Sequence, residues 1–262
     1  MAGCVAPPVQ DLQARWPAQL AASTLIAGVP FVAQEDYECG PAALAMVLQK
    51  AGLSVPLEQL VQQVYLPGRK GSLQIEMLAT TRRHGLLAFP VTSGWDGLLQ
   101  ELNARHPVVV FQNLSLPFYP VWHYAVVIGY DRDRQLVRLH SGRQADQELS
   151  MSTFERTWAR GAHWAMVALP SGDLPASAQA DDLAIHISAL ERINATAARP
   201  FYAAAARRWP QHANLQLGLG NTAYAGADLM GAQQAYQAVL ASQPNHADAW
   251  NNLAQVQMEL GQ

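Results

Sequence analysis

The stretch Val29-Pro-Phe-Val-Ala-Gln-Glu-Asp-Tyr-Glu-Cys-Gly-Pro-Ala-Ala43 decides the fold of the first half of this chain. Pro41 suits the first turn of a helix, so we expect a helix over residues 40–51, closed by the glycine at position 52. Cys39 then stands directly before the helix, where the backbone amides and the helix dipole lower the pKa of a thiol. This position predicts a nucleophilic cysteine.

Two further side chains complete the candidate site. Gln34 lies five residues upstream of Cys39, and we expect its side-chain amide to form an oxyanion hole with the Cys39 backbone N–H. The base must come from elsewhere in the chain, because the helix after Cys39 contains no histidine. His123 opens the apolar run of residues 124–129, which predicts a strand that holds the imidazole rigidly. We therefore expect Cys39 to attack, His123 to act as its base and Gln34 to stabilise the oxyanion.

These motifs resemble those of the double-glycine-leader cysteine peptidases, the bacteriocin-processing family often fused to peptide exporters. The resemblance spans residues 26–169 and rests on Gln34-x4-Cys39-Gly-Pro-Ala, on His123-Tyr-Ala-Val-Val-Ile-Gly-Tyr130, and on the segment 139–158. It implies a papain-like fold and cleavage after Gly-Gly in leader peptides, with Gln34, Cys39 and His123 in the roles given above.

The third member of the family's triad differs in this chain. The family places Asp-Pro at the end of the strand after the histidine, whereas here Ser141 occupies the expected aspartate position. A serine hydroxyl accepts a hydrogen bond from imidazole, but it does not stabilise imidazolium as a carboxylate does. His140 and Asn113 are alternative orienting residues. The serine at position 141 therefore leaves the expected papain-like fold unaffected but bears directly on the expected peptidase activity.

The order of patterns predicts an α+β domain over residues 25–172. Helical patterns cover residues 57–64 and 73–84, after the helix that follows Cys39. Strand patterns follow, and antiparallel pairing is expected for residues 86–90, 107–112, 123–130, 136–139 and 164–169.

Residues 173–262 have a different texture, rich in alanine and glutamine, and are expected to be helical throughout. Pro210 and Pro244 lie 34 residues apart, and small and aromatic residues recur between them at the spacing of a tetratricopeptide repeat. Such an array recruits a protein partner through its concave face. The alternative is a plain alanine-rich helical hairpin.

Residues 1–24 are expected to form an N-terminal tether or lipoprotein-like segment, in which residues 6–19 would be a short tether or a peripheral helix. The opening Met-Ala-Gly-Cys4 resembles the end of a bacterial lipoprotein signal, although the basic and apolar regions of such a signal are missing. If Cys4 carries lipid, the protein sits on a membrane surface of the bacterial cell envelope, in the periplasm; if not, it is cytoplasmic. A disulfide between Cys4 and Cys39 is a competing possibility, and it would block the nucleophile.

Composition excludes several other classes of protein. The net charge of −3 gives no reason to expect a nucleic-acid partner, and no apolar run is long enough to span a membrane. No pair of histidines has metal-ligand spacing with a supporting carboxylate, so we expect no metal and no cofactor.

Two classes of function remain open at this stage. The leading hypothesis is a free-standing cysteine peptidase-like protein that acts on Gly-Gly-type leaders or other extended peptides, with the repeats binding a partner. The alternative is a weakly active or inactive scaffold that binds peptides, which the serine at position 141 favours. Acyl transfer to an amine uses the same residues as hydrolysis.

Overall fold

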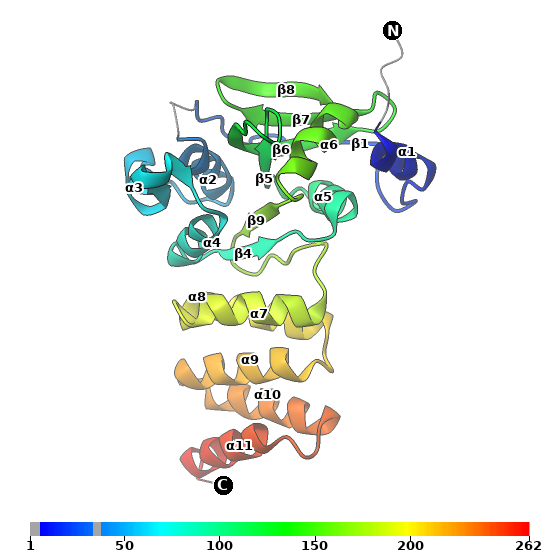
Figure 1. Cartoon of the computed structure of the whole chain (residues 1–262). Coiled ribbons are helices and arrows are strands. Elements are labelled where there is room, and N and C mark those ends of the chain that lie inside the picture. The colour runs from blue at the N-terminus through cyan, green and yellow to red at the C-terminus, as the bar shows by residue number, and fades with distance from the viewer. Residues whose placement is uncertain (1–5, 34–37, 262) are drawn as a thin grey trace. The chain divides into compact units, whose positions relative to one another are not determined.

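The computed structural model describes residues 6–33 and 38–261. It divides into two compact units (Figure 1), the first made of residues 1–81, 89–168 and 175–177, and the second of residues 82–88, 169–174 and 178–262. The limits predicted for the domains from sequence stay a prediction.

A largely antiparallel sheet forms the centre of the first unit. The strand order is β4-β9-β5-β6-β7-β8, and β1 pairs with the far end of β6. The strands are β1 (Ser23–Leu25), β4 (Leu87–Pro90), β5 (Val108–Asn113), β6 (Trp122–Asp131), β7 (Leu136–Ser141), β8 (Gln144–Ser150) and β9 (Ala165–Leu169). Antiparallel pairing joins β9 to β5, β5 to β6, β6 to β7 and β7 to β8. The mixed α/β character and the antiparallel sheet expected from the sequence are confirmed.

Helices pack on both sides of this sheet (Figure 1), with α2 to α4 at one side and α1, α5 and α6 at the other. They are α1 (Pro7–Ala14), α2 (Cys39–Lys50), α3 (Leu57–Val64), α4 (Gln74–Arg83), α5 (Gly94–Asn103) and α6 (Met151–Arg160). Helix α2 is buried all round from Gly40 to Leu48 and contacts β5 and β6. A helix that is apolar on every side belongs to the interior, so Cys39 stands at the end of a rigid core element.

Several elements of the first unit were not predicted, among them two helices and a polar strand. Residues 94–103 and 151–160 form α5 and α6, and residues 144–150 form β8, so the expected order of helices followed by strands is wrong. Strand β8 is polar and largely exposed, which removes the apolar alternation that marks a strand. Helix α6 begins with an N-cap serine that sequence reasoning overlooked. The Ser150 hydroxyl accepts a hydrogen bond from the Thr153 N–H at 3.1 Å.

A small hairpin lies between α3 and α4. Strands β2 (Tyr65–Leu66) and β3 (Gly71–Ser72) pair antiparallel across a short 3-10 turn, η1 (Pro67–Arg69). The sequence Gly68-Arg-Lys-Gly-Ser72 looks like a fragment of a phosphate-binding loop, but it forms the tip and second strand of this hairpin.

The N-terminal segment from residue 6 onwards belongs to the first unit. Helix α1 buries Val9 and Leu12, and the Ala6 N–H donates to the Ser152 hydroxyl at 3.1 Å. Residues 7–14 therefore form a helix that packs within the first unit. The cysteine at position 4 lies outside the described residues.

The second unit contains a series of five consecutive helices, each of which contacts the next. They are α7 (Ala180–Glu191), α8 (Ala195–Arg208), α9 (Ala213–Ala225), α10 (Leu229–Ser242) and α11 (Ala247–Glu259). Helices α8 and α10 begin 34 residues apart, and so do α9 and α11. The capping side chains recur at the same interval, as Asn194 and Asp228 and as His212 and His246. This region is compatible with a helical repeat array.

None of the helices in the described ranges is both long enough and apolar enough to cross a membrane.

The packing of α6 on β5 depends on a glycine, which gives a test of the core. A Cβ at Gly161 would collide with the backbone carbonyl of Phe111, whereas a Cβ at Gly68 would meet nothing within 4 Å. We predict that Gly161→Ala lowers the free energy of unfolding by about 2 kcal/mol or more, because the strand backbone must shift. Gly68→Ala, the matched control, should change it by less than about 0.5 kcal/mol. Urea denaturation measures both, and equal values would contradict this packing.

Candidate active site

Cys39 is the first residue of α2 and a free, half-buried thiol. The backbone N–H groups of Tyr124, Gly40 and Cys39 itself lower its pKa, as expected at a helix N-terminus. Burial has the larger effect, so the pKa of the Cys39 thiol lies above its ordinary value. The helix end thus lowers the thiol pKa in the direction that the sequence predicted, but burial outweighs this effect, and the resting sulfur is protonated at neutral pH. Cys39 is a free thiol, and its possible disulfide partner Cys4 lies outside the described residues.

His123 lies near the start of β6, and its ring is held by the neighbouring strand. Its Nε2 is 2.9 Å from the hydroxyl oxygen of Ser141, the last residue of β7. Burial lowers the pKa of His123 to about 4, so the imidazole is neutral at physiological pH. Ser141 thus contacts the His123 ring, and its orienting role stays a prediction.

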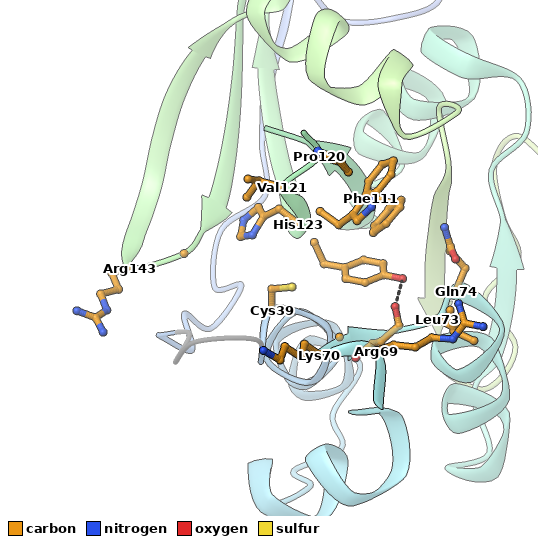
Figure 2. Close-up of a pocket in the computed structure, with 15 residues that line it drawn as sticks. Cys39, Arg69, Lys70, Leu73, Gln74, Phe111, Pro120, Val121, His123 and Arg143 are labelled. Carbon is orange, nitrogen blue, oxygen red and sulfur yellow. Dashed lines mark hydrogen bonds between the residues drawn. The ribbon is translucent and has the colours of Figure 1, made fainter. Parts of the chain in front are cut away.

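Cys39 and His123 line the same cavity, hereafter the Cys39 cavity, and Figure 2 shows His123 above Cys39. The Tyr124 backbone N–H, which interacts with the sulfur, belongs to the residue directly after His123. Since Nε2 is occupied by Ser141, the ring nitrogen left for the thiol is Nδ1. The structure therefore brings Cys39, His123 and Ser141 together. The predicted oxyanion residue, Gln34, lies outside the described residues.

The two alternative orienting residues have other contacts. His140 uses both ring nitrogens, one bonded to the Val29 carbonyl at 3.1 Å and the other accepting from the Asp146 N–H at 3.0 Å. The Asn113 side-chain oxygen accepts from the N–H groups of Ser115 and Val121, both at 3.0 Å. Both residues therefore hold loops in place, and in the described part of the chain only Ser141 is bonded to His123.

The Cys39 cavity has a volume of about 950 Å³ and belongs wholly to the first unit. Aromatic side chains form one side of it, with Phe111 stacked on Trp122 at a centroid distance of 5.0 Å and packed against Tyr124 at 4.7 Å. The segment 118–122 directly precedes His123 in the sequence. Pro120, Val121 and Trp122 line the cavity. Phe118 and Tyr119 are exposed, so that segment is not a packed loop.

The β2–β3 hairpin forms another side of the cavity, and sequence reasoning missed this role. Ser72 packs so closely on Gly40 that a Cβ at Gly40 would collide with the serine side chain. The Tyr124 hydroxyl donates to the Ser72 carbonyl at 3.1 Å. These contacts fix the hairpin to the helix that carries Cys39 and to the strand that carries His123. The sequence signal for this contact is Gly40, because only a residue without a side chain leaves room for Ser72 against the helix end.

The arrangement suits attack by sulfur on a carbonyl carbon. Because thiol and imidazole are both neutral at rest, such an attack would require the thiol proton to pass to Nδ1 of His123 as the C–S bond forms. With hydrogen on Nε2, Ser141 would accept a hydrogen bond from it but would add no negative charge, so an imidazolium formed in this step would be weakly stabilised. Among the described residues, no group of three or more His, Cys, Asp or Glu side chains is placed to hold a metal ion.

Comparison with known proteins gives a family match. The model of the Peptidase_C39-like family matches residues 26–166, more than half of the chain. No curated protein matches the chain.

Three solved structures are similar to the first part of the chain. A C39-like peptidase from Bacillus anthracis has 19% identity and a TM-score of 0.48, over 56% of this chain and 97% of that one. A double glycine motif protease from an AMS/PCAT transporter, in complex with the leader peptide, has 24% identity and a TM-score of 0.42, over 57% and 99%. The peptidase domain of Streptococcus ComA, a bifunctional ABC transporter of a quorum-sensing pathway, has 18% identity and a TM-score of 0.45, over 55% and 99%.

The pH dependence of thiol alkylation tests the neutral pair. Only thiolate reacts, and burial holds the pKa of Cys39 above its usual value, so we predict that the rate of iodoacetamide labelling rises about tenfold per pH unit between pH 6 and 8. Labelling of Cys39 is followed by mass spectrometry in a Cys4→Ala background. A rate that is already constant below pH 7 would reveal a thiolate–imidazolium pair instead.

Replacing Ser141 tests the missing carboxylate. In Ser141→Asp a carboxylate meets Nε2 of His123, raises the pKa of the imidazole above about 4 and stabilises the imidazolium. We predict that Cys39 labelling at pH 6.5 becomes at least about tenfold faster. Ser141→Asn is the uncharged control and should stay within about threefold of the natural protein. Equal rates for the two variants would show that Ser141 does not orient His123.

Proposed function

The chain belongs to the Peptidase_C39-like family, and from this premise we propose that it is a cysteine peptidase that acts on extended peptides in the Cys39 cavity. In this proposal Cys39 attacks the peptide carbonyl, His123 takes the thiol proton and returns it to the leaving amine, and Ser141 orients His123. Gln34 supplies the oxyanion hole with the Cys39 N–H. The observation that carries the proposal is the cavity that contains the half-buried thiol of Cys39 and the ring of His123 held by Ser141.

The substrate class that we propose is a peptide of the Gly-Gly leader type or another extended segment. The order of motifs, Gln34-x4-Cys39-Gly-Pro followed by the His123 strand, is that of double-glycine-leader peptidases. A double glycine motif protease is also among the similar structures.

A scaffold that binds peptides without cutting them is the second candidate. Ser141 in place of a carboxylate favours it. The raised pKa of the Cys39 thiol and the lowered pKa of the His123 imidazole favour it too, because each disfavours the reactive thiolate–imidazolium pair. Acyl transfer to an amine shares the attack by Cys39 and differs only in the final acceptor.

We also propose that helices α7 to α11 are tetratricopeptide repeats that recruit a protein partner. The 34-residue interval between equivalent helix starts supports this. So does the close approach of Gly218 to the Tyr202 ring and of Gly220 to the Tyr236 ring, since the two tyrosines are also 34 residues apart. We place the boundary between the peptidase domain and the repeats near residue 172. For localisation we propose the cell envelope, with lipid on Cys4.

Incubation with Gly-Gly-containing peptides tests the proposed activity. We predict hydrolysis by the natural protein and a loss of at least about a thousandfold in Cys39→Ala, followed by mass spectrometry of the products. Cys4→Ala is the matched control, because it removes the other cysteine of the chain, and it should retain full activity. Peptides that bind but stay intact with the natural protein would overturn the peptidase proposal and select the scaffold.

A further inference from the structure

The two sides of the Cys39 cavity differ in chemistry. In Figure 2, Val121, Pro120 and Phe111 lie above Cys39, Lys70 and Arg69 lie below it, and Arg143 lies to the left at about the height of Cys39. The described lining residues include these three cations and no aspartate or glutamate. We call Phe111, Pro120, Val121 and Trp122 the apolar wall, and we call the three cations below and beside Cys39 (Arg69, Lys70 and Arg143) the cationic wall.

Two arginines carry the argument for the cationic wall. Arg69 ends the η1 turn of the β2–β3 hairpin, and Arg143 lies in the tight turn between β7 and β8, two residues after Ser141. Both are exposed, and neither forms an ion pair with a carboxylate in the described part of the chain.

Other arginines near the β7–β8 hairpin are neutralised. Arg134 pairs with Glu148 at 2.8 Å, and Arg138 pairs with Asp146. Arg143, the arginine of this hairpin that lines the Cys39 cavity, therefore differs from them in having no carboxylate partner among the described residues. This contrast favours a ligand that brings its own carboxylates.

The walls are held in fixed positions. The Tyr124 hydroxyl holds Ser72 at the base of the β2–β3 hairpin, and the stacked rings of Phe111 and Trp122 support the apolar wall. Trp122 is 50% exposed and Val121 is 48% exposed, so both present apolar surface that a ligand would cover.

An extended peptide bound in the Cys39 cavity would contact both walls at once. Successive side chains of an extended chain point to opposite sides, so a peptide between the walls turns every second residue to the apolar wall and the others to the cationic wall. Resting on the proposed function, we propose that the Cys39 cavity selects extended segments in which acidic residues alternate with bulky apolar residues around the scissile bond.

Binding to the Cys39→Ala protein tests this selection without cleavage. Three fluorescent peptides with a central Gly-Gly are compared by anisotropy: one with alternating Glu and Leu on both sides, one with Gln for each Glu, and one with the same Glu and Leu residues grouped in blocks. We expect the alternating peptide to bind at least about tenfold tighter than the Gln peptide at low salt, and to lose this advantage at high salt. The block peptide should bind less tightly than the alternating one.

Variants of the wall locate the effect. Arg69→Gln and Arg143→Gln, each combined with Cys39→Ala, should weaken binding of the alternating peptide about two- to fivefold, as expected for exposed ion pairs, and leave the Gln peptide unchanged. Arg207→Gln is the matched control, because it removes the same charge from an exposed position in α8. It should change neither affinity.

The outcomes separate this proposal from the proposed function. Equal affinity for the Glu and Gln peptides, or for the alternating and block peptides, would overturn the selection proposal even if the natural protein cleaves Gly-Gly peptides. Preferential binding of the alternating peptide without cleavage by the natural protein would support the selection and remove the peptidase proposal.

Discussion

The candidate site depends on close packing between the N-terminus of helix α2 and strand β6. The lack of a side chain at Gly40 lets Ser72 approach the helix end, and the Tyr124 hydroxyl holds the Ser72 carbonyl from the other side. The same approach places the Tyr124 backbone N–H beside the Cys39 sulfur. One contact thus fixes the thiol, the strand that carries the imidazole and a side of the cavity.

Burial is the consequence of this packing, and it determines the chemistry. Taking the thiol and the imidazole out of water disfavours the charged form of each, so the pKa of Cys39 rises while that of His123 falls to about 4. A carboxylate beside His123 would oppose the second effect, but the chain has Ser141 there. The thiol and the imidazole therefore share one cavity while the ionisation of each is suppressed, so an attack by Cys39 would start from the neutral pair.

The sequence predicted the parts of the site that follow local rules. A cysteine before Gly-Pro indicated the helix start, an apolar run after His123 indicated the strand, and the family pattern pointed to position 141. It did not predict β8, which is polar and held by pairing with β7, or the role of Arg69 and Arg143, which reach the cavity only through the fold. The lowering of the thiol pKa by the helix end is outweighed for a related reason, because helix position is local whereas burial is a property of the assembled core. Gln34 stays a prediction.

The tautomer of His123 is the most direct test of the neutral dyad. With ¹⁵N-labelled histidine and His123→Gln for assignment, long-range NMR correlations identify which ring nitrogen carries hydrogen. The account predicts, at pH 7, a neutral ring with hydrogen on Nε2 and a bare Nδ1 whose resonance shifts in Cys39→Ala. A doubly protonated ring at pH 7, or hydrogen on Nδ1 with no response to Cys39→Ala, would contradict it.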